Sequence, residues 1–534
     1  MSQRIAPDQS IEAARGEGSA AGKWRTLIAV SIGAFILLLD ISVVNVALPE
    51  IQTDLDAGFN DLQWVIDSYA LTLAATMLIF GSLGDRFGRR LVFVIGLAAF
   101  SVASLLCGFA WDPLSLNVFR GIQGFGGAAM LSASLALIAG AYSGRDRATA
   151  LAIWGATTAA AVAFGPLIGG LIVEGLAWEW VFFVNVPVGL VTAALVTRGV
   201  PETSDPEATG APDFAGLVTL AGSMTLLVVA LFRGADEGWG STLIVGMLAG
   251  AALLLVLFVQ IEARVKRPLL DLGLFRKPTT TGVSVAILAA AISVFAMLTF
   301  LVFYLQNNLG YNALETGLRL FPLTIAAFFT GMATARLAQR FPARVLIAGG
   351  LAIAGTGLLL SRAVSPDSDW TALLAGGILM GLGLGLVNPT VAGAALGAAP
   401  PAKSGMASGL NSTFRVLGIA IGVAALGAIM ESEVSSSLTA SLGAAPAALV
   451  DVVSTGNLDA AAAAAPPGLA DRASQAADDA FIAGLDTLLL VGALVAYAGA
   501  VLSLVLVRER DTEVAPAEPV PDAAKRQIEP RLAP

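Results

Sequence analysis

The stretch Gly81–Arg90, which reads GSLGDRFGRR, is a charged, glycine-rich decapeptide between two long apolar runs. A hydrocarbon layer does not admit an aspartate and three arginines so close together, so this stretch must be a short turn at a membrane surface. Glycines give the turn its tight geometry, and the arginines indicate the cytoplasmic side. The flanking runs are therefore predicted to be transmembrane helices.

A weaker copy of this decapeptide occurs later in the chain, as ARLAQRFPAR at Ala335–Arg344. Aligned without gaps, the two stretches share one leucine, one phenylalanine and two arginines. Gln339 replaces Asp85, and Pro342 replaces Gly88. Such an internal repeat is typical of a secondary transporter built from two related halves.

The composition is that of a polytopic helical membrane protein. Hydrophobic residues make up 56% of the 534 residues, and the mean hydropathy is +0.81. Charged residues account for 13%, against about 25% in a soluble domain. Apolar stretches longer than ~18 residues recur along the whole chain. The net charge of −9 gives no support to a nucleic-acid partner.

The side chains available for chemistry are few. The chain has no histidine, so any proton step near neutral pH must use a carboxylate. Its one cysteine, Cys107, lies in an apolar run, where packing is the expected role. No metal-ligand spacing, phosphate-binding loop or nucleophile motif occurs, and we expect neither an enzyme nor a cofactor.

We predict an all-α membrane fold with fourteen spans, two six-helix halves and two additional helices between them. Most of the 30 Lys and Arg residues fall on one side of this topology, which places both termini in the cytoplasm of a cell-membrane protein. The predicted spans are Leu27–Leu48, Leu62–Leu83, Leu91–Ala110, Leu116–Ala139, Ala148–Val173, Trp180–Thr197, Phe214–Phe232, Leu243–Ile261, Val283–Leu305, Gly317–Leu337, Val345–Leu360, Ala372–Leu396, Gly405–Met430 and Phe481–Val507.

Five segments follow from these spans. They are a cytoplasmic tail (1–24), a first six-helix half (25–200), an acidic linker with the two additional helices (201–278), a second half (279–508), and a disordered cytoplasmic tail (509–534). The second half contains a long external loop (431–480), rich in Ala, Ser and Pro, in which the run Ala460–Ala465 could form a short helix. We expect a monomer.

Asp40 is the strongest candidate for function, because it lies halfway along the first span. A charge at mid-bilayer costs about 2.5–3.5 kcal/mol on insertion scales. Desolvation would favour its protonated form, which suits a reversible proton site. The alternative is a structural hydrogen bond to a neighbouring helix.

Arg120 is the second intramembrane charge, and it shares a helix face with Gln123. An arginine in this position could hold a carboxylate or modulate its proton affinity. The alternative is that it snorkels to the external interface.

Two further motifs suggest moving parts. In the fifth span, Gly165 and Pro166 predict a bend, either a gate between the halves or a static packing feature. In the decapeptide, Asp85 could pair with Arg86, Arg89 or Arg90, or with the N-terminus of a helix from the other half. Such contacts would hold the cytoplasmic side closed, although a solvated surface bridge is the alternative.

Other residues are weaker candidates for a substrate cavity, and simple packing, rim solvation or an interhelical hydrogen bond is the alternative for each. Arg415, within the thirteenth span, is costly enough there to need a partner. The remaining candidates are Asn45, Trp64, Asp67, Gln123, Phe300, Tyr304, Phe321 and Glu431.

Several of these motifs resemble those of the major facilitator superfamily. The decapeptide is similar to its signature loop, and Arg120–Gly124 resembles its fourth-helix motif, which the family ties to proton coupling. Gly165–Gly170 resembles the fifth-helix motif of antiporters. Leu39–Pro49 and Trp178–Gly189 resemble the fourteen-span drug:proton antiporters of the QacA/EmrB type, although Glu179 stands where that branch usually has arginine.

The resemblance implies a proton-driven exporter of amphipathic substrates that works by alternating access, with Asp40 and Arg120 in the coupling step. Its partners would be a small amphipathic molecule, protons and the lipid bilayer. Two other classes stay open, a proton-linked uptake carrier and a membrane scaffold or sensor that does not transport. The direction of substrate flux distinguishes the uptake carrier from the exporter. A reconstituted protein that moves no substrate would favour the scaffold or sensor.

Overall fold

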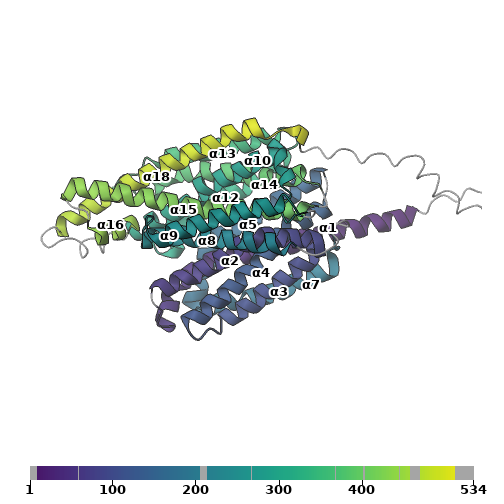
Figure 1. Cartoon of the computed structure of the whole chain (residues 1–534), viewed down its shortest axis with the longest axis horizontal. Coiled ribbons are helices and arrows are strands. Elements are labelled where there is room, and N and C mark those ends of the chain that lie inside the picture. The colour runs from purple at the N-terminus through teal and green to yellow at the C-terminus, as the bar shows by residue number, and fades with distance from the viewer. Residues whose placement is uncertain are drawn as a thin grey trace, which may run out of the picture.

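The computed structural model describes residues 9–57, 59–142, 144–204, 213–265, 268–366, 368–400, 403–443, 446–456 and 470–511. Within these ranges the chain is almost entirely helical, and none of the described residues forms a strand. The long apolar runs of the sequence thus become helices that lie roughly along one axis (Figure 1).

The helices fall into three groups in chain order. The first half comprises α1 (Gln9–Asp54), α2 (Phe59–Phe87), α3 (Arg89–Cys107), α4 (Pro113–Ala141), α5 (Gly144–Gly175), α6 (Trp180–Phe183) and α7 (Asn185–Gly199). The additional pair is α8 (Phe214–Glu237) and α9 (Thr242–Glu262). The second half comprises η1 (Leu272–Arg276), α10 (Pro278–Ala290), η2 (Ala291–Phe295), α11 (Ala296–Phe303), η3 (Tyr304–Asn308), α12 (Ala313–Leu337), α13 (Ala343–Ser361), η4 (Trp370–Leu373), α14 (Leu374–Ala398), α15 (Ser404–Leu442), α16 (Ala447–Ser454), α18 (Ala470–Leu506) and η6 (Glu509–Asp511).

The predicted spans match these helices. Among the described residues, 13 helical segments are long and apolar enough to cross a membrane. The remaining predicted span lies on α5, a helix of 32 residues. The prediction of an all-α membrane fold with about fourteen spans is confirmed.

Local sequence signals explain where several helices begin. Asp112 and Ser115 form a capping box at the start of α4, which also has Pro113 in its first turn. Asn312 and Glu315 form the corresponding box at the start of α12. Between α2 and α3 the chain turns at Gly88, whose φ of 119° favours glycine.

Each half has its own apolar core. One core is built mainly from α1–α5 and the other from α10–α18. Matching helices pack alike in the two halves, since α2 and α3 contact α4 as α12 and α13 contact α14. The halves meet where α2 packs on α15 and α5 packs on α12. This repetition agrees with the internal repeat inferred from the two decapeptides.

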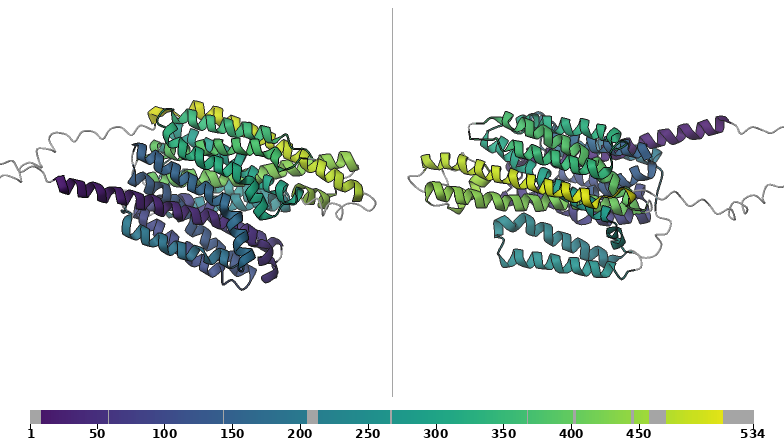
Figure 2. Two further views of the ribbon diagram at one scale, coloured as in Figure 1. Left: turned by 180° about the vertical axis from the view of Figure 1, so that it is seen from behind. Right: turned by 90° about the horizontal axis from the view of Figure 1, so that it is seen from above.

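The additional pair α8–α9 stands at the side of the bundle, where α8 contacts α2 and α15 (Figure 2, right). It therefore lies beside the seam between the halves. Most of the surface of α9 is free of protein contacts, because only 17% of its most apolar stretch is buried inside the protein. Such a helix is suited to face lipid.

The helices extend further than the sequence predicted. The segment predicted as a long external loop begins and ends as helix, because α15 continues to Leu442 and α18 begins at Ala470. The start of α18 is rich in alanine, which favours helix, and on α15 the side chains of Val434 and Leu438 are buried in the core of the second half. Likewise, α1 begins at Gln9 within the predicted cytoplasmic tail. These extensions lie at opposite ends of the molecule (Figures 1 and 2).

Other predicted segments fall outside the described residues. They are the alanine run Ala460–Ala465, most of the acidic linker (205–212) and most of the C-terminal tail (512–534). In the second half, the ninth predicted span is a single helical path in which two π-helical turns, η2 and η3, interrupt the α-helix. Turns of this kind occur frequently at functional sites.

Candidate functional site

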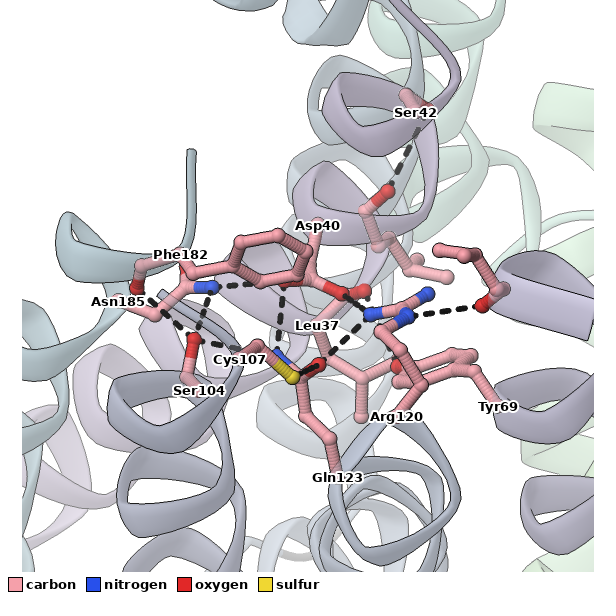
Figure 3. Close-up of polar contacts among 12 residues, drawn as sticks. Leu37, Asp40, Ser42, Tyr69, Ser104, Cys107, Arg120, Gln123, Phe182 and Asn185 are labelled. Atoms are coloured by element: carbon pink, nitrogen blue, oxygen red, sulfur yellow. Dashed lines mark hydrogen bonds and ion pairs between the residues drawn. The ribbon is translucent and has the colours of Figure 1, made fainter. Parts of the chain in front are cut away.

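Asp40 lies inside the first half, on α1, and its side chain is only 1% exposed. Its carboxylate accepts three hydrogen bonds (Figure 3). Arg120 donates to Oδ2 at 2.5 Å, while Gln123 and Asn185 donate to Oδ1 at 2.9 and 2.7 Å. The structure therefore surrounds this mid-membrane charge with donors and leaves it no contact with lipid.

Arg120, on α4, is also 1% exposed. Besides Asp40, its guanidinium donates to the Gln123 side chain at 2.7 Å and to the Val65 carbonyl at 3.0 Å. The guanidinium carbon lies 4.3 Å from the centre of the Tyr69 ring, which adds a cation–π contact. The structure places Arg120 against the carboxylate rather than at the interface, so snorkelling is excluded for this state.

A second layer of polar side chains orients the first. Ser104 on α3 accepts hydrogen bonds from Asn185 at 3.0 Å and from Gln123 at 3.2 Å. The Ser104 hydroxyl donates to the Phe182 carbonyl at 2.8 Å. The Cys107 thiol lies 3.8 Å from the Gln123 amide oxygen. Five helices of the first half, together with the short α6, thus build one buried polar network (Figure 3).

Sequence reasoning found the two charges and Gln123 but missed Asn185 and Ser104 as partners. Asn185 lies in the quoted Trp178–Gly189 motif, and that position was the available signal. Ser104 is one of many small polar residues in the spans, and no local pattern distinguishes it. In the close-up the Asn185 amide contacts the carboxylate directly, and Ser104 contacts Asn185 and Gln123 behind it (Figure 3).

This network holds two opposite charges away from water. A buried ion pair is strongly destabilised when one partner loses its charge, by about 3–5 kcal/mol when a partner is removed. Protonation of Asp40 would have that effect, because a neutral carboxyl no longer compensates the Arg120 charge. The Asp40–Arg120 pair therefore joins α1 to α4 inside the first half.

The second polar site joins the two halves. Asp85, near the end of α2, is 6% exposed, and its carboxylate accepts the backbone N–H groups of Gly405 and Met406, both at 2.7 Å. These groups belong to the first turn of α15, where backbone donors have no partner within the helix. Asp85 thus caps a helix of the opposite half, and its negative charge complements the dipole of that helix.

Arg89 holds Asp85 in place, with Nε at 2.9 Å and Nη2 at 2.7 Å from Oδ1. The other arginines of the decapeptide are not part of this contact. Arg86 makes a cation–π contact with Phe87, at 5.3 Å from the ring centre. Arg90 donates to the Val200 carbonyl at 3.1 Å.

Two glycines allow the halves to meet at Asp85. A Cβ atom on Gly81 would lie 2.4 Å from the Gly405 carbonyl oxygen, and one on Gly405 would lie 2.4 Å from the Gly81 carbonyl oxygen. No Cβ atom fits such a separation. The glycines of the decapeptide therefore serve close helix packing as well as the turn.

Glu202, at the start of the linker, is a partner that the sequence did not reveal. Its carboxylate accepts the N–H groups of Arg90 at 2.9 Å and Leu91 at 3.0 Å, at the N-terminus of α3. It also lies against Gly88, where a Cβ atom would be 2.6 Å from the carboxylate carbon. Because Gly88 has no side chain, the linker carboxylate can approach this turn and bind the N-terminus of α3.

The fifth-helix motif packs α5 on α1. A Cβ atom on Gly165 would lie 2.1 Å from Cβ of Ser42, so only glycine permits this approach. The backbone of α5 is helical through Pro166, whose side chain lies outside the described part of the structure. The described contacts agree with close packing, and a gate at this motif stays a prediction.

The weaker candidates separate into several environments. Phe300 and Tyr304 are buried in the core of the second half, in agreement with the packing alternative. Phe321 contacts Phe164 across the two halves, with ring centres 5.7 Å apart. The Arg233 guanidinium lies 5.5 Å from the centre of the Trp64 ring, beside the additional pair.

The other four candidates lie outside the core. Asn45 is exposed, and Asp67, Arg415 and Glu431 are half-buried. Asp67 and Glu431 both have interaction partners. Within the described part of the chain, no three His, Cys, Asp or Glu side chains gather as metal ligands would.

Comparison with known proteins identifies relatives along the whole chain. A model of the Major Facilitator Superfamily matches residues 30–423. The tetracenomycin C resistance and export protein of Streptomyces glaucescens is 34% identical and covers 93% of this chain and 94% of its own. The multidrug transporter protein MdtP of Bacillus subtilis is 32% identical, over 79% of this chain and 78% of its own.

Solved structures show the same fold at much lower identity. A proton:xylose symporter aligns with a TM-score of 0.61 at 13% identity, over 93% of this chain and 98% of its own. The human organic anion transporter MFSD10 aligns with a TM-score of 0.58 at 15% identity, over 89% of this chain and 99% of its own.

Proposed function

Because the chain belongs to the major facilitator superfamily and is a multi-pass protein of the plasma membrane, we propose that it exports amphipathic or cationic drugs, antibiotics or related metabolites in exchange for protons. Its relatives support export, since their names record resistance to or export of tetracenomycin C, and multidrug transport. The family is one of transporters, which argues against a catalytic activity.

The observation that carries the proton-coupling step is the buried Asp40–Arg120 pair with its ring of amide donors. In the described state the carboxylate is fully engaged. A proton that reaches Asp40 removes one charge of the pair and frees Arg120, Gln123 and Asn185 to rearrange. In this proposal, the free-energy change of Asp40 protonation drives the movement of α1 relative to α4.

The contact between Asp85 and the N-terminus of α15 supports alternating access. It joins the halves at the end that the loop charges place in the cytoplasm. In this account the contact holds the cytoplasmic side closed while the opposite side exchanges substrate and protons. Opening toward the cytoplasm then requires that the N–H groups of Gly405 and Met406 leave the carboxylate.

The test is transport by full-length protein in proteoliposomes with an imposed pH gradient, with ethidium and rhodamine B as separate substrates. Wild type should move at least one dye when the gradient is imposed, and Asp40→Asn should not. Asp56→Asn is the matched control, because Asp56 is exposed at the end of α1 and has a φ of 49° that asparagine tolerates. Equal gradient-driven transport by Asp40→Asn would refute the coupling role.

The same assay decides between the proposal and its rivals. A dye that enters with protons, rather than against them, would indicate a proton-linked uptake carrier. An inert wild type with both dyes would favour a narrower substrate or a protein that does not transport. Both termini should be accessible from the cytoplasmic side, which labelling of terminal tags in intact cells would establish.

A further inference from the structure

Two carboxylates meet at one end of the additional helix pair, the end that the loop charges place in the cytoplasm. Asp213 is the N-cap of α8, and Glu262 is the last residue of α9. A Cβ atom on Gly216 would lie 2.6 Å from Oδ2 of Asp213 and 2.7 Å from Oε1 of Glu262. These two oxygen atoms therefore border the same small space beside the first turn of α8.

Neither of these two oxygen atoms has a hydrogen-bond partner, and both are closed off from solvent. The other oxygen of each carboxylate is held by the backbone. Asp213 Oδ1 accepts the N–H of Gly216 at 2.8 Å, and Glu262 Oε2 accepts the N–H of Leu270 at 3.2 Å. Both carboxylates are thus fixed with one acceptor atom unused, and such atoms are rare in protein interiors.

The surroundings of Glu262 are apolar, and the residue is only 4% exposed. Phe258 lies one turn before it on α9, and Leu269 precedes the residue whose N–H it accepts; both belong to the core of the first half. Burial disfavours an ionised carboxyl, and a second carboxylate beside it disfavours ionisation further. Two carboxyl groups in this situation share a proton, because both cannot carry a charge at such close range.

Within the described part of the chain, no cation is bound to either carboxylate. The neighbouring Lys and Arg side chains at this end are bound to other groups or are exposed. Those bound to other groups are Lys403 with Asp271, Arg89 with Asp85, Lys277 with the Ala398 carbonyl, and Arg86 with the Phe87 ring. Arg264 and Arg276 are exposed. A proton is therefore the simplest partner for the two unused oxygen atoms.

We propose that Asp213 and Glu262 bind one proton between them near neutral pH, and that this proton holds the cytoplasmic ends of α8 and α9 together. With the proton on Glu262, its O–H donates to Oδ2 of Asp213, and both unused oxygen atoms gain a partner. Loss of the proton leaves two adjacent negative charges, which push the helix ends apart. Asp213 is half-buried, so protons reach the pair from its side.

This second proton site is separate from the Asp40 network and does not rest on the proposed export function. Its effect extends to the contact between the halves, because Leu270, which Glu262 binds, precedes Asp271. The Asp271 N–H donates to Sδ of Met406 at 3.2 Å, and the Met406 N–H donates to Asp85. Loss of the proton should therefore loosen the segment that packs on the first turn of α15.

The test compares wild type with Glu262→Gln, whose amide can donate to Asp213 at every pH. The folding equilibrium of purified full-length protein in detergent is measured by denaturant titration at pH 6, 7 and 8. Wild type should lose stability relative to Glu262→Gln as the pH rises, by up to about ten-fold per pH unit. The reason is that the folded pair holds a proton that the unfolded chain has released above pH ~5.

Two further variants make the comparison specific. Asp213→Asn keeps an acceptor for the Gly216 N–H but removes one of the two charges, so it should also reduce the pH dependence. Glu174→Gln changes an exposed glutamate near the end of α5, and it should follow wild type at all three pH values. A stability difference between wild type and Glu262→Gln that is constant from pH 6 to pH 8 would overturn the proposal.

Infrared spectroscopy detects the proton directly, because the carbonyl stretch of a protonated carboxyl is separate from the carboxylate bands. Wild type at pH 7 should show such a band that Glu262→Gln lacks, whereas an unchanged band pattern would refute the shared proton. A wild type that gains stability with rising pH and with added Na⁺ would show that a cation occupies the space instead.

These readouts fail independently of the export proposal, since neither requires transport. If the pair holds no proton while Asp40→Asn abolishes gradient-driven transport, the exporter stands without this second site. If the pair holds a proton while no gradient drives transport, the site stands and proton coupling falls.

Discussion

Replacement of Asp85 by alanine should open the cytoplasmic side of the protein. The substitution removes the acceptor of two backbone N–H groups at the start of α15, and helix caps of this kind are worth about 0.5–2 kcal/mol. It also leaves the buried Arg89 unpaired in the closed state, and a buried charge without its partner costs about 3–5 kcal/mol. In the open state, water reaches both groups. We therefore expect the closed state to lose about 3.5–7 kcal/mol relative to the open one, a shift of several hundred-fold or more in their ratio.

The assay is a distance measurement between the two halves. Spin labels at Phe87→Cys and Phe341→Cys report on the turns after α2 and α12, where both side chains are exposed. A Cys107→Ser background removes the native thiol. Wild type should give one dominant short distance, and Asp85→Ala should give a longer one as well.

The internal repeat supplies a matched control for this measurement. Gln339 occupies the position of Asp85 in the second decapeptide, but its side chain is exposed and donates to the Ala335 carbonyl in the last turn of α12. Gln339→Ala should leave the distance distribution unchanged. If Asp85→Ala also leaves it unchanged, the carboxylate does not hold the halves together. Membrane insertion of both variants should be normal, which expression level and gel filtration would establish.

Three further predictions concern the same end of the molecule. Gly81→Ala should weaken the contact of α2 with α15 by about 1–3 kcal/mol, because the added methyl group meets a backbone carbonyl. Gly170→Ala is the control, since its methyl group would meet no atom within 4 Å. Equal unfolding temperatures for the two variants would contradict the predicted weakening. Glu202→Gln should cost about 0.3–1 kcal/mol by removing a charge from the N-terminus of α3, and an unfolding temperature equal to that of wild type would argue against it. The hydrogen bond from Lys403 lowers the pKa of Asp271. The pair therefore stabilises the fold above pH ~4, and this stabilisation is lost as the pH falls through the lowered pKa of Asp271. Asp271→Asn should therefore lower the free energy of unfolding by at most about 1 kcal/mol, by the same amount at pH 6 and at pH 8. A loss that differs between these two pH values would show that Asp271 does not titrate below this range.

Sequence patterns predicted most of the architecture because membrane helices are encoded by length and apolarity. Each predicted span lies on one helix or on consecutive helical segments, and the two decapeptides lie in equivalent turns of the two halves. The ends of helices were predicted less well. Val434 and Leu438 stabilise the part of α15 beyond the predicted span by packing in the core of the second half. Local hydropathy does not reveal such a contact, because it depends on which helices meet in the fold.

The candidate sites were predicted unevenly, for a physical reason. Asp40 and Arg120 are conspicuous because a charge in hydrocarbon is costly, and the structure brings them together. Asn185 and Ser104 are uncharged, so their roles depend on which helices meet. The sequence predicted that Asp85 pairs with a neighbouring arginine or with a helix N-terminus of the other half, and the structure shows both contacts, but no motif indicated that the helix would be α15. Glu202 is separated from its partners by more than a hundred residues.

The central claim, that Asp40 is the proton site coupled to export, has one direct test. Purified protein in weakly buffered solution receives the dye that the wild type transports, and released protons are measured with a pH indicator near neutral pH. We predict that wild type releases protons when the dye binds, and that Asp40→Asn binds the dye without release. Equal proton release by the two proteins would show that the coupled proton resides elsewhere.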